Sequence, residues 1–274
     1  MYTGQMERID VMGQIARQAG EFMLGADGMR ASTDKLNAKD FVTVADIKSQ
    51  DIIRNELAAR FAGAVILSEE DDQAARRPMY EPDFTGFVLD PIDGTYNFKR
   101  GMRESAISIG YVEDGQPVAG VVYDPYKDEL YEAEVGKGAR CNGQPIHVSD
   151  QQTLEGASIA TSNSSDDEAM ARNLRRHLAI YDNTGSMPWT MCAGSGVLIM
   201  TNVARGRFDA YHHNGLKPWD NAAVFLILRE AGGVVETLRG ETAGFTTSDV
   251  LLGTPAVVAA LRQVFNQIDT KLLR

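Results

Sequence analysis

A short apolar run that ends in two carboxylates constrains this chain more than any other stretch. Residues 87–89 predict a buried strand, and the segment Asp-Pro-Ile-Asp-Gly-Thr follows directly at residues 90–95. A turn there would let Asp90 and Asp93 leave the end of the strand together, with the carbonyl of Ile92 facing the same space. Three oxygens directed at one point suit a hard cation such as Mg²⁺.

The remaining residues of the segment suit an anion. Pro91 has no N–H and a fixed φ, so it stiffens the link between the two acids. Gly94 lets the backbone approach a ligand closely, and the N–H groups after it, with the Thr95 hydroxyl, can hold an anion. The same six residues also fit an ordinary strand-to-turn connection with solvated acids, so the rest of the chain has to decide.

Composition narrows the partners of the protein. Hydrophobic residues make up 43% of the 274 residues, which is enough for one large or two modest domains with a substantial core. The net charge of −11 argues against nucleic acid as a partner, because a sequence-independent binder needs a basic face. An acidic protein that handles an anionic substrate must supply positive charge locally, and bound metal ions can do so.

Cysteine usage and hydropathy predict the compartment. Cys141 and Cys192 are far apart and match no metal-ligand spacing, so we expect no disulfide and a reducing cytoplasm. No apolar run approaches the about 20 residues of a membrane span. The N-terminus shows no signal-peptide pattern, and we expect no membrane partner.

The periodicity of the chain predicts a first α+β portion and a second α/β portion, divided near residue 148. Asn142-Gly143 marks a hairpin turn, and Pro255 opens a terminal helix. The first portion is expected to contain helices at 6–24 and from 46, a mobile loop at 29–40, and strands at 64–67, 87–89, 106–112, 118–123 and 129–135. The second portion is expected to contain strands at 157–161, 208–211, 234–236 and 250–252, and helices at 167–178, 197–204 and 221–230. In the helix at 167–178 we expect Met170, Leu174 and Leu178 to form one apolar face.

Further acids stand where apolar elements begin or end. Glu69 and Glu70 follow the strand at 64–67, where adjacent strand ends gather ligands in α/β folds. Asp46 and Asp220 each precede a helix and could serve simply as N-caps. Each acid is explicable alone as a cap or a loop residue, but their shared context points to one site.

Taken together, these motifs resemble the inositol monophosphatase family, within the lithium-sensitive, magnesium-dependent sugar-phosphatase superfamily. The first family signature matches Asp-Pro-Ile-Asp-Gly-Thr-Tyr-Asn-Phe at 90–98 over its whole length. The second matches Trp-Asp at 219–220, Asn-Ala-Ala at 221–223 and Glu-Ala-Gly-Gly at 230–233. Further matches are Ser-Glu-Glu at 68–70, the motif at 40–46 and the hairpin at 137–144. The resemblance covers nearly the whole chain.

The resemblance implies a layered αβαβα fold, with an N-terminal antiparallel-sheet portion at 1–148 and a C-terminal α/β portion at 149–274. It also implies hydrolysis of a small phosphorylated alcohol with two or three Mg²⁺ ions, sensitivity to Li⁺ and a homodimer. The implied first metal site uses the acidic pair, above all Glu70, with Asp90 and the Ile92 carbonyl, and the second uses Asp90, Asp93 and Asp220. A weaker third ion would sit near Glu70 and the activated water. The implied catalytic residues are Asp46, Thr95 and Glu70, of which Thr95, with Asp46 behind it, orients or deprotonates that water. The implied substrate contacts are Asp93, Gly94, Thr95, Gly194, Ser195, Gly196, His213 and Asp220.

Two positions depart from the inositol-specific members of the family. They carry a glutamate that accepts hydrogen bonds from substrate hydroxyls, where this chain has His213. They carry an arginine where this chain has Met191. Both changes leave the metal ligands in place and put myo-inositol phosphate itself in doubt. We therefore expect it to be a mediocre substrate, although His213 could also be a solvent-facing residue at the rim.

Other substrates and roles stay open at this point. Histidinol phosphate, fructose 1,6-bisphosphate and 3′-phosphoadenosine 5′-phosphate are alternatives within the superfamily. A haloacid-dehalogenase-type phosphatase is disfavoured because that class uses an Asp-x-Asp pair. A binding or regulatory homologue without catalysis should have lost a metal ligand, and all are present here. A regulatory role added to catalysis stays open.

Overall fold

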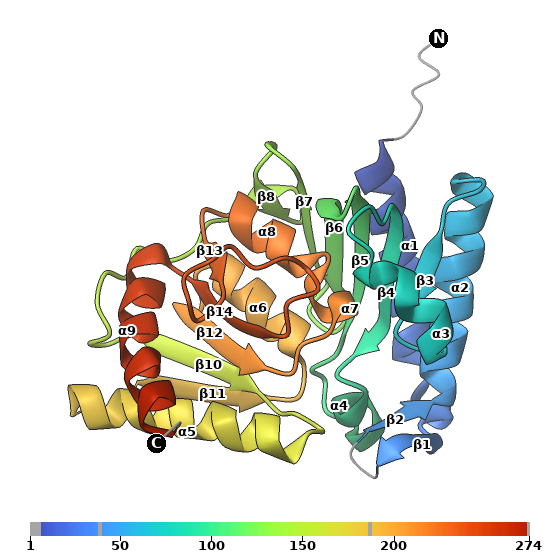
Figure 1. Cartoon of the computed structure of the whole chain (residues 1–274). Coiled ribbons are helices and arrows are strands. Elements are labelled where there is room, and N and C mark those ends of the chain that lie inside the picture. The colour runs from blue at the N-terminus through green and yellow to red at the C-terminus, as the bar shows by residue number, and fades with distance from the viewer. Residues whose placement is uncertain (1–6, 38–39, 186–187, 273–274) are drawn as a thin grey trace.

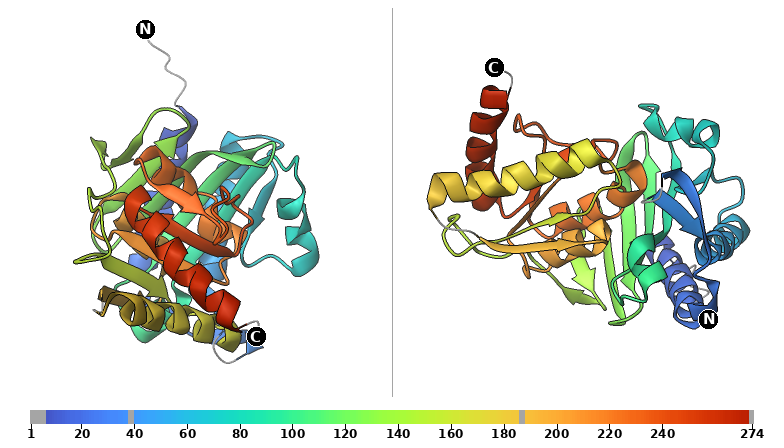
Figure 2. Two further views of the ribbon diagram at one scale, coloured as in Figure 1. Left: turned by 60° about the vertical axis from the view of Figure 1, so that its left-hand side comes forward. Right: turned by 90° about the horizontal axis from the view of Figure 1, so that it is seen from below.

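Two β-sheets, separated and flanked by helices, form five layers in a computed structural model that describes residues 7–37, 40–185 and 188–272 (Figure 1). Helices α1 and α2 cover the outer face of the first sheet, and α6, α7 and α8 lie between the two sheets. Helices α5 and α9 cover the outer face of the second sheet (Figure 2). The predicted αβαβα fold is therefore confirmed.

The first sheet contains seven strands among the described residues, in the order β3-β4-β5-β6-β7-β8-β9. β3 and β4 are parallel, and every later neighbour is antiparallel, which is the predicted meander. The strands are β3 (Ile66–Ser68), β4 (Gly86–Asp93), β5 (Ala106–Glu113), β6 (Gln116–Asp124), β7 (Glu129–Glu134), β8 (Ala139–Cys141) and β9 (Gln144–Pro145).

The second sheet has the order β11-β10-β12-β14-β13 within the described part of the chain. β10 pairs in parallel with β11 and β12, whereas β14 is antiparallel to both of its neighbours. The strands are β10 (Ser158–Ser162), β11 (Trp189–Ala193), β12 (Ala210–Asn214), β13 (Val234–Glu236) and β14 (Asp249–Gly253). The expected boundary near residue 148 falls between β9 and β10, and two separate units remain a prediction.

The helices build the other three layers. None of them, over residues 7–37, 40–185 and 188–272, is both long enough and apolar enough to cross a bilayer. They are α1 (Arg8–Gly25), α2 (Val44–Arg60), α3 (Gln73–Arg76), α4 (Thr95–Arg100), α5 (Asp167–Thr184), α6 (Gly196–Ala204), α7 (Pro218–Asn221), α8 (Val224–Glu230) and α9 (Pro255–Leu272), with 3₁₀ turns at Asp27–Met29 and Arg77–Tyr80.

An irregularity in β4 places the carboxylates of the central motif. Asp90 pairs with Ser108 and Asp93 with Ala106, so three residue steps on β4 oppose two on β5. Side chains alternate along a regular strand, and residues three apart would face opposite sides. The extra residue of this bulge turns both acids to the same side. The turn that we predicted at Pro91 is wrong, because β4 runs on to Asp93 and the chain turns only at Gly94, with φ +82°.

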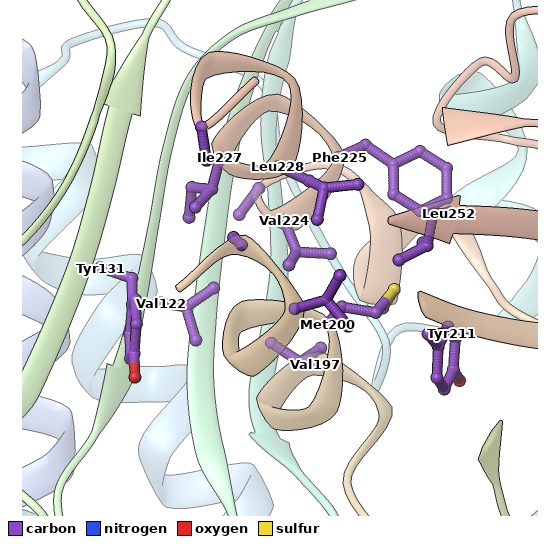
Figure 3. Close-up of a cluster of buried hydrophobic side chains, with 14 of the residues drawn as sticks. Val122, Tyr131, Val197, Met200, Tyr211, Val224, Phe225, Ile227, Leu228 and Leu252 are labelled. Atoms are coloured by element: carbon purple, nitrogen blue, oxygen red, sulfur yellow. The ribbon is translucent and has the colours of Figure 1, made fainter. Parts of the chain in front are cut away.

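The central helix layer packs closely on the first sheet because two glycines leave room for it. A Cβ atom at Gly110 of β5 would lie 2.6 Å from the Cβ of Ala222, and one at Gly120 of β6 would lie 2.7 Å from the Cα of Ala223. The residues that lead into α8 thus rest directly on β5 and β6. Figure 3 shows the apolar core that this contact closes, in which side chains of α6 and α8 meet Val122 and Leu252 from the two sheets.

Several expectations about single elements are wrong. The expected mobile loop at 29–40 contains β1 (Ser32–Asn37), which pairs with β2 (Asp40–Thr43); residues 38–39 lie outside the described part. β1 consists mainly of polar residues, so it lacks the alternation of apolar and polar side chains that indicates a strand. Leu174 and Leu178 of α5 are exposed, not buried. β11 was not predicted, and β12 begins two residues later than expected and contains His213.

Candidate metal centre

Three aspartates converge where the two sheets meet. Asp90 and Asp93 come from the end of β4 and Asp220 from α7, and one carboxylate oxygen of each lies within 4.8 Å of the other two. Asp220 is the third residue of α7, so it is not an N-cap, the role that was open beside that of a ligand. Its Oδ2 accepts a hydrogen bond from the Lys217 N–H at 2.7 Å. Asp90 Oδ1 accepts one from the Ile92 N–H at 3.1 Å. These contacts fix the side chains with their remaining oxygens in the cleft.

Without a bound cation, the surroundings of these three carboxyl groups disfavour their ionisation. Burial, together with the charges of neighbouring acids, raises the pKa values of Asp90 and Asp220 well above the usual range. Burial also raises the pKa of Asp93 to about 7, although the Ser195 hydroxyl opposes this. Buried acids that repel one another are stable as anions only beside a cation, and carboxylate oxygens are the ligands that Mg²⁺ prefers. The donor set therefore fits a divalent metal.

The acidic pair after β3 is bridged by a lysine. Lys35 Nζ donates to Glu69 Oε1 and to Glu70 Oε1, each at 2.8 Å. Burial and the charge of Glu69, opposed by Lys35, raise the pKa of Glu70 to about 8. Glu69 acts more strongly than Glu70 on the pKa of Asp90 and also raises that of Asp93. The charge of Glu69 thus acts on all three aspartates.

The structure brings Thr95 and Asp46 together. Thr95 Oγ1 lies 3.1 Å from Asp46 Oδ1 and 3.2 Å from the carbonyl oxygen of Ile92. Asp46 is the third residue of α2, and the N-cap is Thr43. Asp46 is therefore not the N-cap that its position in the sequence predicted. Asp46 accepts hydrogen bonds from the Thr43 N–H and hydroxyl. Burial outweighs these bonds and raises the pKa of Asp46 to about 6.

The start of α6 supports the metal centre directly. Ser195 is the N-cap of α6, and its hydroxyl donates to Asp93 Oδ2. The Val197 N–H donates to the same oxygen at 3.1 Å. Because Ser195 is 1% exposed and engaged with Asp93, it positions a carboxylate. Gly194 and Gly196 line the cleft on either side of it.

The cleft around these residues has a volume of about 1250 Å³. This exceeds the usual range of ligand pockets, roughly 300–1,000 Å³. One wall carries the acids and Lys35, and the other carries residues from the second sheet. His213 belongs to this second wall. It lies in β12 and is only 3% exposed, so the alternative of a solvent-facing residue at the rim is wrong. The side chain of Met191 lies outside the described residues.

The environment of His213 is polar and well defined. Its Nδ1 lies 3.0 Å from Asn173 Nδ2 and 3.2 Å from Ser162 Oγ. Burial lowers the pKa of His213 to about 4, so the ring is neutral at physiological pH. The ring stacks on Tyr211, with 5.9 Å between the ring centroids.

Two residues of the site escaped the sequence analysis. Lys35 is one of them, because its bridging of the acidic pair depends on the unpredicted strand β1. Asn173 was not noted at all. It shares the buried face of α5 with Ala169 and Ile180, and a polar residue at that apolar spacing was the available signal.

Comparison with known proteins finds relatives that match nearly the whole chain. Residues 2–271 match the family model described as inositol monophosphatase family. The Nus factor SuhB of Escherichia coli is 31% identical over 262 residues, which cover 92% of this chain and 93% of that protein. A solved IMPase of Thermotoga maritima superimposes with a TM-score of 0.84 at 28% identity, covering 97% and 99% of the two chains. An IMPase/NADP phosphatase solved with NADP and Ca²⁺ gives a TM-score of 0.80 at 25% identity over 93% of each chain.

Proposed function

The chain belongs to the inositol monophosphatase family, and from that premise we propose that it is a Mg²⁺-dependent phosphomonoesterase acting on a small phosphorylated alcohol. The observation that carries the proposal is the triad of Asp90 and Asp93, which are buried, and Asp220, which is half-buried; their raised pKa values mean that a bound cation would stabilise the ionised form. A bound Mg²⁺ neutralises phosphate charge and acidifies a coordinated water.

The chain supplies ligands for more than one ion. In our proposal Asp90, the Ile92 carbonyl and one acid of the Glu69–Glu70 pair hold the first ion. Asp90, Asp93 and Asp220 hold the second, and Glu70 borders a weaker third position. Of the acidic pair we favour Glu69 as the closer ligand, because it acts more strongly on the pKa of Asp90.

Thr95 is suited to orient the attacking water. Its hydroxyl proton points to Asp46 Oδ1 or to the Ile92 carbonyl, so its oxygen lone pairs are free to accept from a water in the cleft. Asp46 holds this arrangement and is the nearest group that can take up a proton. The backbone N–H groups of Gly94 and Thr95 then hold the phosphate, and Gly194, Gly196 and His213 face its alcohol half.

A phosphate-release assay tests the proposal. The full-length protein is incubated with a panel of phosphate esters, first with excess Mg²⁺ and then with excess EDTA. We expect turnover only with Mg²⁺, and inhibition by Li⁺ as the family resemblance predicts. The panel includes histidinol phosphate, fructose 1,6-bisphosphate, 3′-phosphoadenosine 5′-phosphate and myo-inositol 1-phosphate. Undiminished hydrolysis in excess chelator would exclude the mechanism.

A binding or regulatory role is a second candidate, because relatives carry the name Nus factor. The two roles are separable in cells of the source organism. If a deletion phenotype is restored by Asp93→Asn as well as by the wild type, the role in the cell does not need turnover. Restoration by the wild type alone would favour the phosphatase.

We further propose a homodimer in the cytoplasm. Leu174, Leu178 and Tyr181 form one stripe on α5 and are 48%, 59% and 49% exposed, and Trp189 at the edge strand β11 is 81% exposed. An apolar stripe of this kind is typical of a surface that another chain covers. Light scattering should give twice the monomer mass for the wild type and the monomer mass for Leu178→Glu. A monomeric wild type at micromolar concentration would contradict the dimer.

A further inference from the structure

His213 is held by an asparagine whose own orientation is fixed. Asn173 Oδ1 accepts a hydrogen bond from the backbone N–H of Asn214 at 2.9 Å. A backbone N–H can only donate, so this end of the amide must be the oxygen. The other end, Nδ2, therefore faces His213 Nδ1 at 3.0 Å and donates to it.

The tautomer of His213 follows from this contact. A nitrogen that accepts a hydrogen bond carries no proton, and a neutral imidazole has one proton to place. Nδ1 is the acceptor, so Nε2 carries the proton. Ser162 Oγ, 3.2 Å from Nδ1, is compatible with this assignment because its hydroxyl can also bond to the Tyr211 hydroxyl at 2.7 Å.

The protonated nitrogen is the one that the ring offers to the cleft. His213 lines the cleft, and Nδ1 is occupied by Asn173 and Ser162. No described residue accepts a hydrogen bond from Nε2 in the structure. Gly215 lies beside it and leaves space there, since even a Cβ at that position would be 3.7 Å from Nε2.

The wall around His213 suits a negatively charged or acceptor group. Among its described lining residues between 162 and 217, none is acidic, and Lys217 adds a positive charge. The wall is continuous with the metal centre, because Gly196 separates Ser162 from the Ser195–Asp93 contact; a Cβ at Gly196 would lie 3.5 Å from Ser162 Oγ. A substrate whose phosphate is at the aspartates can thus extend toward His213 within the same cleft.

We propose that His213 determines substrate choice by donating a hydrogen bond from Nε2 to an acceptor on the alcohol half of the ester. The preferred substrate carries a carboxylate or a second phosphate there, in preference to hydroxyl groups alone. A hydroxyl can also accept this bond, but a charged acceptor gains more from a donor in a buried site. This inference rests on the proposed phosphatase function and specifies its substrate class.

Two matched pairs of esters test the preference. Glucose 1-phosphate and glucuronic acid 1-phosphate differ at C6, where a carboxylate replaces a hydroxymethyl group, and fructose 1,6-bisphosphate carries a second phosphate that fructose 1-phosphate lacks. The kcat/KM ratio of the acidic member, which carries the extra acid group, to the member without it is measured with excess Mg²⁺ for the wild type, His213→Gln and His213→Met. Gln keeps a side-chain N–H donor, whereas Met has nearly the same shape without one.

We expect the wild type to favour the acidic member of at least one pair by about tenfold or more. His213→Gln should retain most of that ratio, and His213→Met should lose it. A wild type without preference, or a Met variant that keeps the preference, would overturn the inference while the proposed function stands. If the wild type hydrolyses none of the four esters but releases phosphate from another ester of the panel, the inference fails and the proposed function stands. Release from no ester in excess Mg²⁺ would refute both.

Nitrogen NMR of the full chain provides a readout that does not depend on turnover or on the stability of a variant. The chain has only four histidines, so the ring signals of His213 are identified by their loss in His213→Gln. We expect a protonated Nε2 and an unprotonated Nδ1 at pH 7. The opposite tautomer would overturn the inference.

Discussion

Two clusters of buried or half-buried acids in this protein have opposite electrostatics. In the metal centre, Asp90, Asp93 and Asp220 lie together, and burial raises their pKa values. At the other end of the first sheet, Glu129 of β7 meets Arg205 and Arg207, which follow α6.

In the second cluster, the charge of Glu129 is balanced by residues of the same chain. Burial alone would raise the pKa of Glu129, but hydrogen bonds from Arg207 and Tyr131 and the charges of both arginines lower it to about 2. Glu129 therefore joins the first sheet to the central helix layer without help. The aspartates instead leave their charge unbalanced. The difference teaches that one cluster is built to hold the fold and the other to hold a ligand, at a cost in stability.

Asp93→Asn should show most clearly that the metal centre serves ligand binding and not the stability of the fold. The amide oxygen can still accept from Ser195 and Val197, so the fold should persist. The lost charge weakens metal binding, and turnover should fall about a hundredfold or more, since metal charge contributes several kcal/mol to the transition state. The melting temperature of the metal-free protein at pH 8 should rise. Steady-state kinetics and calorimetry measure both, with the exposed Asp150→Asn as control.

Equal activity of Asp93→Asn and the wild type would show that Asp93 is only a loop acid. A lower melting temperature of the metal-free variant would contradict the electrostatic cost that we assign to the cluster.

The metal-free protein should lose stability as the pH rises. Asp93 has a pKa of about 7 in the folded chain against 3.8 in the unfolded chain, so between these values the folded state binds more protons. The free energy of unfolding therefore falls from pH 4 to pH 7, and the raised pKa values of Asp90 and Asp220 extend this fall above pH 7. Saturating Mg²⁺ should remove most of this slope by binding the ionised form. Denaturant titrations between pH 4.5 and 8 measure it, and a Mg²⁺-independent stability at pH 8 would refute the comparison.

Glu129→Gln should act on stability with little effect on turnover. We expect a loss of about 1–2 kcal/mol, because the ion pair is only partly buried. The pKa of Glu129 is about 2 folded and 4.5 unfolded, so its stabilisation is complete above pH 4.5 and disappears as the pH falls toward 2. Urea unfolding at pH 7 and pH 3 measures this. Glu134→Gln, which breaks a more exposed pair with Lys137, is the matched control and should cost less.

The parts of the site that lie in short sequence segments could be predicted. Asp90, Asp93 and Gly94 follow one another, and their chemistry is readable from their order. The convergence of Asp220 with them was also predicted, but as what the family resemblance implies, because its position before an apolar helix taken alone fitted an N-cap equally well. The fold class followed from the alternation of apolar periods and the family resemblance.

Contacts between distant elements could not be read in the same way. On α5, the apolar positions Leu174 and Leu178 predicted a buried face that is in fact exposed. The buried face instead holds Asn173, Arg176 and His177, whose partners come from β12 and β14. A polar side chain can take the place of an apolar one in the interior when it has a hydrogen-bond partner there. That partner lies on a distant element and cannot be recognised from a single sequence.

The bulge in β4 has a consequence for how this segment can vary. Substitution at Ile92 changes the volume of a buried side chain and leaves both acids on the cleft side. Deleting one residue between Asp90 and Asp93 would remove the bulge and leave the two acids two positions apart, still on one face of the sheet. Straightening β4 at its present length would instead turn Asp93 toward the opposite face, where α2 packs. The bulge, and not the number of residues between the acids, therefore keeps this metal ligand in the cleft.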